Sequence, residues 1–153
     1  MISSIINKIL GIKEAHAHCD IPCGIYTPEP AKTAAETVEK MVQKISELTP
    51  PMPQDFIKGD TSALKNKATS LMRYTMVKEQ HAQICKQELL ILWTDYFKEE
   101  HLKMFPDLHD KFWKATKLCS KNKREVNPEA AAELRKAVDE IAEMFAKAEA
   151  SKA

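Results

Sequence analysis

Two cysteines and one histidine, His18, Cys19 and Cys23, lie within six residues of the sequence. A tetrahedral zinc site normally takes its four ligands from two separated pairs, and the sequence has no second Cys or His pair at such spacing. Thiolates combined with backbone nitrogens in one plane suit nickel(II) or copper(II) instead. These residues therefore indicate a site for one of those two ions.

The residues before His18 have the features of a removable leader. They end in Ala15, His16 and Ala17, the small-x-small pattern of a processing site. Their apolar stretch is short and is broken by Lys8, which makes it a weak translocation signal. We therefore predict that residues 1–17 are a leader that is removed on maturation and is not an export signal.

Composition restricts the fold that could position these residues. The chain has 153 residues, enough for one ordinary domain, and its 3 Gly and 7% aromatic residues favour helices over sheets. The formal charge of +1 gives no bulk basic field for nucleic acid, and no stretch approaches the roughly 20 apolar residues of a bilayer-spanning helix. We expect no nucleic-acid and no membrane partner.

Four amphipathic segments follow an irregular stretch at residues 18–30. Apolar residues recur at helical spacing in each segment: Val38, Met41, Val42 and Ile45; Leu64, Ala68, Leu71 and on to Phe97; Leu108, Phe112, Ala115 and Cys119; Leu134, Val138, Ile141 and Phe145. The second segment is long enough to contain one break, and Asn127 with Pro128 makes the clearest helix start. The pattern predicts an all-α, up-and-down four-helix bundle at residues 31–153, with an N-terminal metal-binding hook at residues 18–30.

The segment from His18 to Tyr26, HCDIPCGIY, closely resembles the amino-terminal hook of the nickel superoxide dismutases, His-Cys-Asp-x-Pro-Cys-Gly-x-Tyr. Three further blocks are similar to that family in the same order: VKEQ at 77–80, LWTDYFK at 92–98 and FPDLH at 105–109. The resemblance implies conversion of superoxide to oxygen and hydrogen peroxide by Ni(II)/Ni(III) cycling. It also implies a four-helix bundle, one nickel ion per subunit and a homo-oligomer, the hexamer of the family.

The resemblance assigns the nickel ligands position by position. Cys19 and Cys23 would give thiolate sulfurs, the backbone nitrogen of Cys19 a third ligand and the α-amine of His18 a fourth, with the His18 imidazole binding axially in the oxidised state. That amine exists only after a maturation protease has cut behind Ala17, because before cleavage the nitrogen lone pair is delocalised into the carbonyl. A free α-amine has a pKa of about 7.7 to 8.0 and loses its proton to a metal near neutral pH.

Further residues are carried over around these ligands. Tyr26 and Tyr96 resemble the phenols that border the open axial position, where they would order superoxide or water. Pro22 would shape the turn that returns the second thiolate to the metal, and Asp20 belongs to the same motif. The family has an acid and an arginine that support the axial imidazole, whereas the matching residues here are Ala34 and His81. Our hypothesis is that His81 offers a different contact to His18, or that water fills the gap.

Two other interpretations use the same residues. A non-catalytic helical protein could hold nickel or copper in the hook without redox cycling, and a secreted bundle could instead form a disulfide between Cys19 and Cys23. We expect Cys85 and Cys119 to be buried or half-buried thiols and His101 to be a surface or capping residue. The weak signal features and unpaired thiols favour a cytoplasmic protein.

Overall fold

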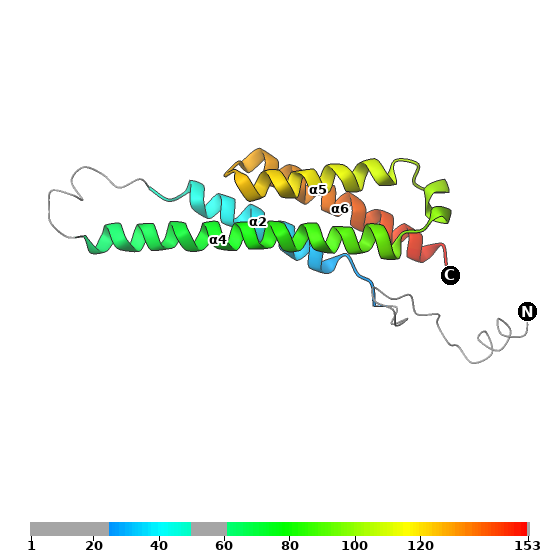
Figure 1. Cartoon of the computed structure of the whole chain (residues 1–153), viewed down its shortest axis with the longest axis horizontal. Helices are drawn as coiled ribbons and strands as arrows, with labels where there is room; N and C mark the ends of the chain where they lie inside the picture. Colours follow the sequence, from blue (N-terminus) through cyan, green and yellow to red (C-terminus); the bar gives the residue numbers. More distant parts are fainter. Residues whose placement is uncertain (1–24, 50–60, 153) are drawn as a thin grey trace, which may run out of the picture.

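The computed structural model describes residues 25–49 and 61–152. Within these ranges the chain forms four long helices and no strand: α2 (Glu29–Ser46), α4 (Ser62–Ile91), α5 (Leu108–Arg124) and α6 (Pro128–Ala150). Consecutive helices run in opposite directions (Figure 1), and α2 and α5 each lie against both α4 and α6. The predicted all-α, four-helix bundle is confirmed.

Local sequence signals explain where helices begin. The side chain of Asn127 accepts a hydrogen bond of 2.8 Å from the backbone N–H of Ala130, and Pro128 occupies the first turn of α6. Helix α2 begins at Glu29, with Pro30 in its first turn, so its first two residues fall within the stretch predicted to be irregular. Proline is tolerated there because the first N–H groups of a helix have no intrahelical partner.

The long second helix, for which one break was predicted without a position, changes its winding at its C-terminal end. After Ile91 the chain continues as a π-helical turn, η1 (Leu92–Tyr96), and becomes extended at Phe97. A 3₁₀ turn, η2 (Glu99–Lys103), then leads toward α5. Single π turns are rare in proteins overall, but those that occur are frequently found at functional sites.

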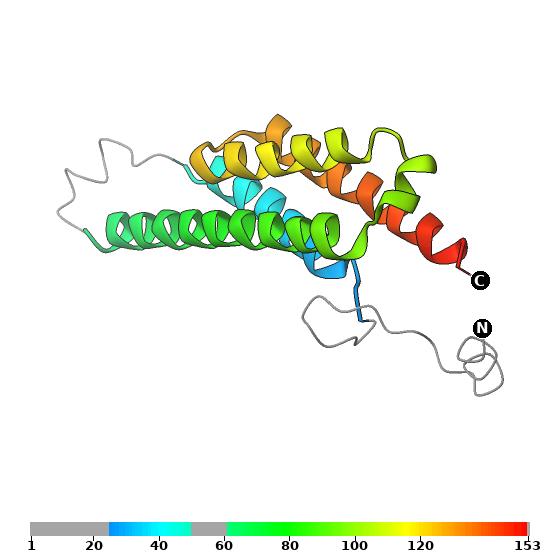
Figure 2. The same ribbon diagram turned by 45° about the vertical axis from the view of Figure 1, so that its right-hand side comes forward.

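The four apolar stripes meet in one core. All four helices contribute to its largest fully buried side chains: Val38 of α2, Leu89 of α4, Phe112 of α5, and Leu134 and Ile141 of α6. Figure 2 shows that the beginning of α4 projects beyond the other helices, on the side away from the end of α6. None of the described helices combines the length and apolar character that crossing a bilayer requires.

A buried lysine closes the end of α5. The Lys78 side chain is 1% exposed, and its ammonium donates hydrogen bonds to the backbone carbonyls of Asn122, Lys123 and Glu125. These carbonyls carry the partial negative charge of the helix C-terminus, which favours a cation. Burial lowers the pKa of Lys78, and the neighbouring Glu79 opposes that shift.

The two cysteines of the bundle lie together in the core. Cys85 of α4 and Cys119 of α5 are both buried, and neither is in a disulfide. A hydrogen bond to Cys119 and then burial raise the pKa of the Cys85 thiol well above its usual range. The expectation that both residues are buried thiols is confirmed.

Candidate metal centre and its tyrosines

The residues predicted to form the site divide into two groups. Tyr26, His81 and Tyr96 are described by the structure, whereas the predicted ligands and their nearest neighbours lie outside the described residues: His18, Cys19, Asp20, Pro22 and Cys23. Within residues 25–49 and 61–152, no group of three or more His, Cys, Asp and Glu side chains could hold a metal ion.

The two predicted tyrosines lie side by side. Tyr26, just before α2, presents its ring to Tyr96 in an edge-on arrangement, with 5.6 Å between ring centroids and 61° between ring planes. The hydroxyl oxygen of Tyr26 is buried, and its ring packs against the hydrophobic core. This pair stands at the end of the bundle where α2 begins and where α4 and α6 end (Figure 1). The fold therefore brings together two residues that are 70 positions apart in the sequence.

Aromatic rings fix the side chain of Tyr96 on several sides. Phe97 meets it edge-on at 4.9 Å, Phe145 of α6 lies at 4.3 Å, and His101 of η2 stacks parallel to it at 5.8 Å. Tyr96 is 4% exposed as a result. Its phenol can thus act on a bound molecule only through the hydroxyl group.

That hydroxyl group belongs to a polar cluster formed with the end of α6. The Tyr96 hydroxyl donates a hydrogen bond of 2.6 Å to Glu149 Oε1. The Lys152 ammonium lies 2.6 Å from the same carboxylate oxygen, 3.4 Å from the Tyr96 oxygen and 4.6 Å from the ring centroid. Burial, and then the bond to Glu149, raise the pKa of Tyr96 well above its usual range.

Sequence reasoning missed Glu149 and Lys152. They lie 53 and 56 residues from Tyr96, and no motif connects them. One signal was present, because Glu149 follows Phe145 by one helical turn and so continues the apolar stripe of α6 with a carboxylate. A charged residue in line with a buried stripe indicates a polar partner in the core.

We expected His101 to be either a surface residue or a capping residue. Its side chain is buried, 4% exposed, so it is not a surface residue. It does act as a cap, the other expectation, because its Nδ1 accepts a hydrogen bond of 2.9 Å from the backbone N–H of Lys98 at the start of η2. Burial lowers the pKa of His101; Lys152 and Lys98 add to this shift, and Glu100 and Glu149 oppose it. The imidazole is therefore held neutral, with its proton on Nε2.

The two positions that depart from the family have different surroundings. Ala34 of α2 is fully packed in the core. His81 of α4 is half-buried, and its Nδ1 lies 2.9 Å from the carbonyl oxygen of Val77. Since a carbonyl only accepts, Nδ1 carries a proton, and in the neutral form of the ring Nε2 is an acceptor.

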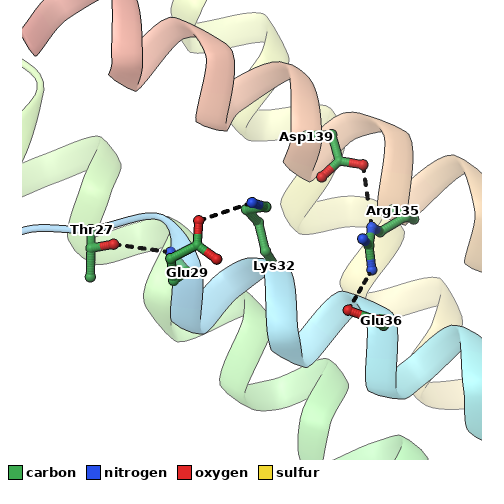
Figure 3. A network of polar contacts seen from close by, with 6 residues as sticks. All are labelled: Thr27, Glu29, Lys32, Glu36, Arg135 and Asp139. Atoms are coloured by element: carbon green, nitrogen blue, oxygen red, sulfur yellow. Dashed lines mark hydrogen bonds and ion pairs between the residues drawn. The ribbon is translucent and has the colours of Figure 1, made fainter.

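Ion pairs anchor the first turns of α2, which directly follow Tyr26 and the two residues after it. Figure 3 shows these contacts, made by Thr27, Glu29, Lys32, Glu36, Arg135 and Asp139. Arg135 of α6 bridges Glu36 of α2 at 3.1 Å and Asp139 at 3.2 Å. The Thr27 hydroxyl accepts a hydrogen bond of 3.3 Å from the backbone N–H of Glu29, which gives the first residue of α2 a partner for its N–H group. The segment that leads out of the predicted hook is thereby tied to α2, and α2 is tied to α6.

Comparison with known proteins identifies the family. Residues 13–149 match the family model of the nickel-containing superoxide dismutases. The chain belongs to this family. It is 34% identical over 128 residues to superoxide dismutase [Ni] from Streptomyces seoulensis and 33% identical over 128 residues to that of Streptomyces coelicolor, in each case over 84% of this chain and 82% of the relative.

Solved structures of nickel superoxide dismutases have the same fold. The native enzyme aligns with a TM-score of 0.69 and 28% identity, over 86% of this chain and 99% of the other. A structure with nickel ligation of the oxidised state gives 0.69 and 31%, over 89% and 100%. The predicted reaction and the nickel cofactor are confirmed, and the non-catalytic alternative is not favoured.

Proposed function

We propose that residues 18–23 bind the nickel ion of this superoxide dismutase and that Tyr26 and Tyr96 border its open position. The observation that carries the proposal is the contact of Tyr26 with Tyr96, 5.6 Å apart, at one end of the bundle. Tyr26 is three positions after Cys23, so the Cα atoms of the two residues can be no more than about 11 Å apart. A metal held by Cys19 and Cys23 would thus lie close to the tyrosine pair.

The donor set of the hook fits nickel. Two superoxide ions and two protons give one oxygen and one hydrogen peroxide, and bound nickel would supply the two one-electron steps. The thiolates of Cys19 and Cys23 and the amide nitrogen of Cys19 are electron-rich ligands that favour the higher oxidation state. The two phenols would order superoxide or water, and no covalent chemistry is required of them.

His81 is our candidate for supporting the axial imidazole. The bond to Val77 leaves His81 Nε2 as an acceptor, so it can receive the N–H of a ligating His18 ring. Ala34 offers no polar group for this purpose, because it is a core residue. One histidine would then replace the acid and the arginine of other family members.

Maturation by a protease that cuts behind Ala17 would create the amine ligand. Nickel-dependent superoxide consumption should therefore appear in a chain that begins at His18 and be absent from the chain that retains residues 1–17. Cys19→Ser should abolish activity in the trimmed chain, whereas Cys119→Ala, at a buried thiol of α5, should retain it. Equal activity of the trimmed and untrimmed chains would exclude the amine as a ligand.

We also propose a homo-oligomer, the hexamer of the family. Apolar side chains lie exposed on the first half of α4: Leu71, Met72 and Met76. Met72 and Met76 are 66% and 67% exposed and one turn apart, so both lie on one face. Burial of such a face between subunits is favourable.

The cytoplasm is our proposed location. Cys85 and Cys119 are neighbours in the core and remain thiols, as is usual for a reducing compartment. The sequence before His18 is a poor export signal. Fractionation of the native host, with immunodetection of the processed chain, tests this assignment.

A further inference from the structure

One carboxylate oxygen receives two hydrogen-bond donors beside the proposed metal site. Glu149 Oε1 lies 2.6 Å from the Tyr96 hydroxyl and 2.6 Å from the Lys152 ammonium. We infer that Glu149 is a positioning residue that holds the hydroxyl proton of Tyr96, so that this tyrosine offers only the lone pairs of its oxygen to the metal site. The inference rests on the proposed function, because it defines what Tyr96 does there.

The chemistry of the three groups leaves one arrangement of protons. A phenol has one proton to donate, and an ionised carboxylate only accepts. The Lys152 ammonium has donors and no acceptor, so it cannot take the phenol proton and instead donates toward Glu149 and Tyr96. A distance of 2.6 Å is typical of the strong O–H···O⁻ bond between a hydroxyl and a carboxylate.

The surroundings keep the hydroxyl in place. The groups that face Tyr96 from other elements are the rings of Tyr26, Phe145 and His101, and the last of these is neutral. The charged groups that face it are Glu149 and Lys152, whose side chains are 48% and 38% exposed. The ring is thus fixed by packing, while its hydrogen-bond acceptor is in contact with solvent.

This arrangement sorts the molecules of the reaction by their hydrogen-bonding character. Superoxide is an anion that only accepts hydrogen bonds, whereas water and hydrogen peroxide can also donate. A Tyr96 oxygen whose proton is committed to Glu149 can bind water or peroxide, and it has no proton with which to bind superoxide. Of the two molecules proposed above for the phenols, superoxide or water, Tyr96 therefore orders water, together with the product, and superoxide takes its hydrogen bonds from other donors.

Two substitutions of Glu149 separate its hydrogen bond from its charge. Glu149→Ala removes the acceptor and frees the Tyr96 proton. Glu149→Gln removes only the charge. The Lys152 ammonium cannot accept a hydrogen bond, so the glutamine must turn its amide oxygen, and not its NH₂ group, toward Lys152 and Tyr96. Each substitution is made in the parent and in Tyr96→Phe, which lacks the hydroxyl.

The first measurement uses the metal-free full chain and does not depend on nickel activity. Infrared spectra of protein carrying isotopically labelled tyrosine give the C–O stretch of Tyr96, identified by its loss in Tyr96→Phe. This band reports whether the phenol donates a strong hydrogen bond. It should shift in Glu149→Ala and stay near the parent position in Glu149→Gln, and an unshifted band in Glu149→Ala would overturn the inference.

The second measurement uses azide as an accepting anion with the nickel-loaded chain that begins at His18. In Glu149→Ala, azide should inhibit superoxide consumption about tenfold more tightly, because the freed hydroxyl can donate to it. In Glu149→Gln, and in every Tyr96→Phe background, its affinity should be little changed. Azide affinity could instead rise equally in Glu149→Ala and Glu149→Gln, or rise in Glu149→Ala even when Tyr96→Phe has removed the hydroxyl. Either result would mean that the charge of Glu149 alone controls azide binding, and it would overturn the inference.

The two measurements also separate this inference from the proposed function. A parent chain that shows the infrared band of a donating phenol but consumes no superoxide when loaded with nickel would refute the proposed metal site. The role of Tyr96 in that site would fall with it, while the bond between Tyr96 and Glu149 would stand.

Discussion

His81 carries an acceptor nitrogen at a position where the family has a different residue. We expect His81→Ala to lower superoxide turnover about tenfold or more, because partners of a metal-bound imidazole contribute roughly 10- to 100-fold. Decay of superoxide after rapid mixing with the nickel-loaded chain measures this effect. His109→Ala is the control, since His109 is exposed and accepts a hydrogen bond from Trp93. Unchanged turnover in His81→Ala would assign the support of His18 to water.

His101 should make the folded state sensitive to acid. Its pKa is lowered in the folded chain by burial, so below the unfolded value of about 6.5 the unfolded state binds more protons. The free energy of unfolding therefore decreases as the pH falls from about 6.5 toward the lower folded pKa.

His101→Gln should remove this part of the pH dependence, because glutamine can still accept the Lys98 N–H but does not titrate. Urea unfolding midpoints near pH 7.5 and near pH 5.5 measure it, with the parent losing more stability between the two than the variant. Equal losses would show that carboxylates alone account for the acid sensitivity.

Single residues were predictable where a motif or a stripe contained them. Tyr26 and Tyr96 were identified by resemblance, and the structure brings their rings together. Glu149 and His101 were not identified as partners of Tyr96, because their contacts cross between elements and depend on side-chain packing. The ligands in the hook lie outside the described residues and stay a prediction.

At the scale of elements, the transition from α4 to η1 places Tyr96. Helical spacing alone predicted a long helix reaching Phe97 with room for one break, and the regular helix ends at Ile91. The apolar spacing of a π turn over five residues differs too little from that of an α-helix for the sequence to reveal it. Helix starts were more predictable, because Asn127 and Pro128 act through their immediate neighbours.

Lys78 joins two elements, since it lies on α4 and holds the carbonyls that end α5. We expect Lys78→Met to lower the free energy of unfolding by about 2 to 4 kcal/mol, because methionine fills the space but leaves buried carbonyls without a donor. Urea unfolding followed by circular dichroism measures this loss. Lys117→Met, at an exposed lysine of α5, is the matched control and should change stability by less than about 0.5 kcal/mol. Equal stability of the two variants would contradict this account of Lys78.

At the scale of the whole molecule, the bundle separates two functions. The tyrosine pair lies at the end where α2 begins and α6 ends (Figure 1), and the exposed Met72 and Met76 lie in the first half of α4, away from its end at Ile91. The proposed chemistry and the proposed subunit contact therefore use different parts of the chain. Substitutions on the first half of α4 can test assembly without touching Tyr26 or Tyr96.

Met72→Glu combined with Met76→Glu should dissociate the proposed oligomer, because two buried charges without partners are costly at an interface. Sedimentation velocity of the trimmed, nickel-loaded chain measures the assembly, and circular dichroism verifies that the helices persist. Met104→Glu, at an exposed methionine outside α4, is the control. An unchanged sedimentation coefficient in the double variant would place the contact elsewhere.

The pairing of Cys85 with Cys119 affects how long the enzyme can work in its own product. Hydrogen peroxide attacks thiolates, and the Cys85 thiol resists ionisation because of its bond to Cys119 and its burial. The Cys85 thiol is thus protected from oxidation by peroxide during turnover. Oxidative damage should concentrate on the thiolates of the proposed hook. An enzyme inactivated by its product would then keep a folded helical bundle but lose a working metal site.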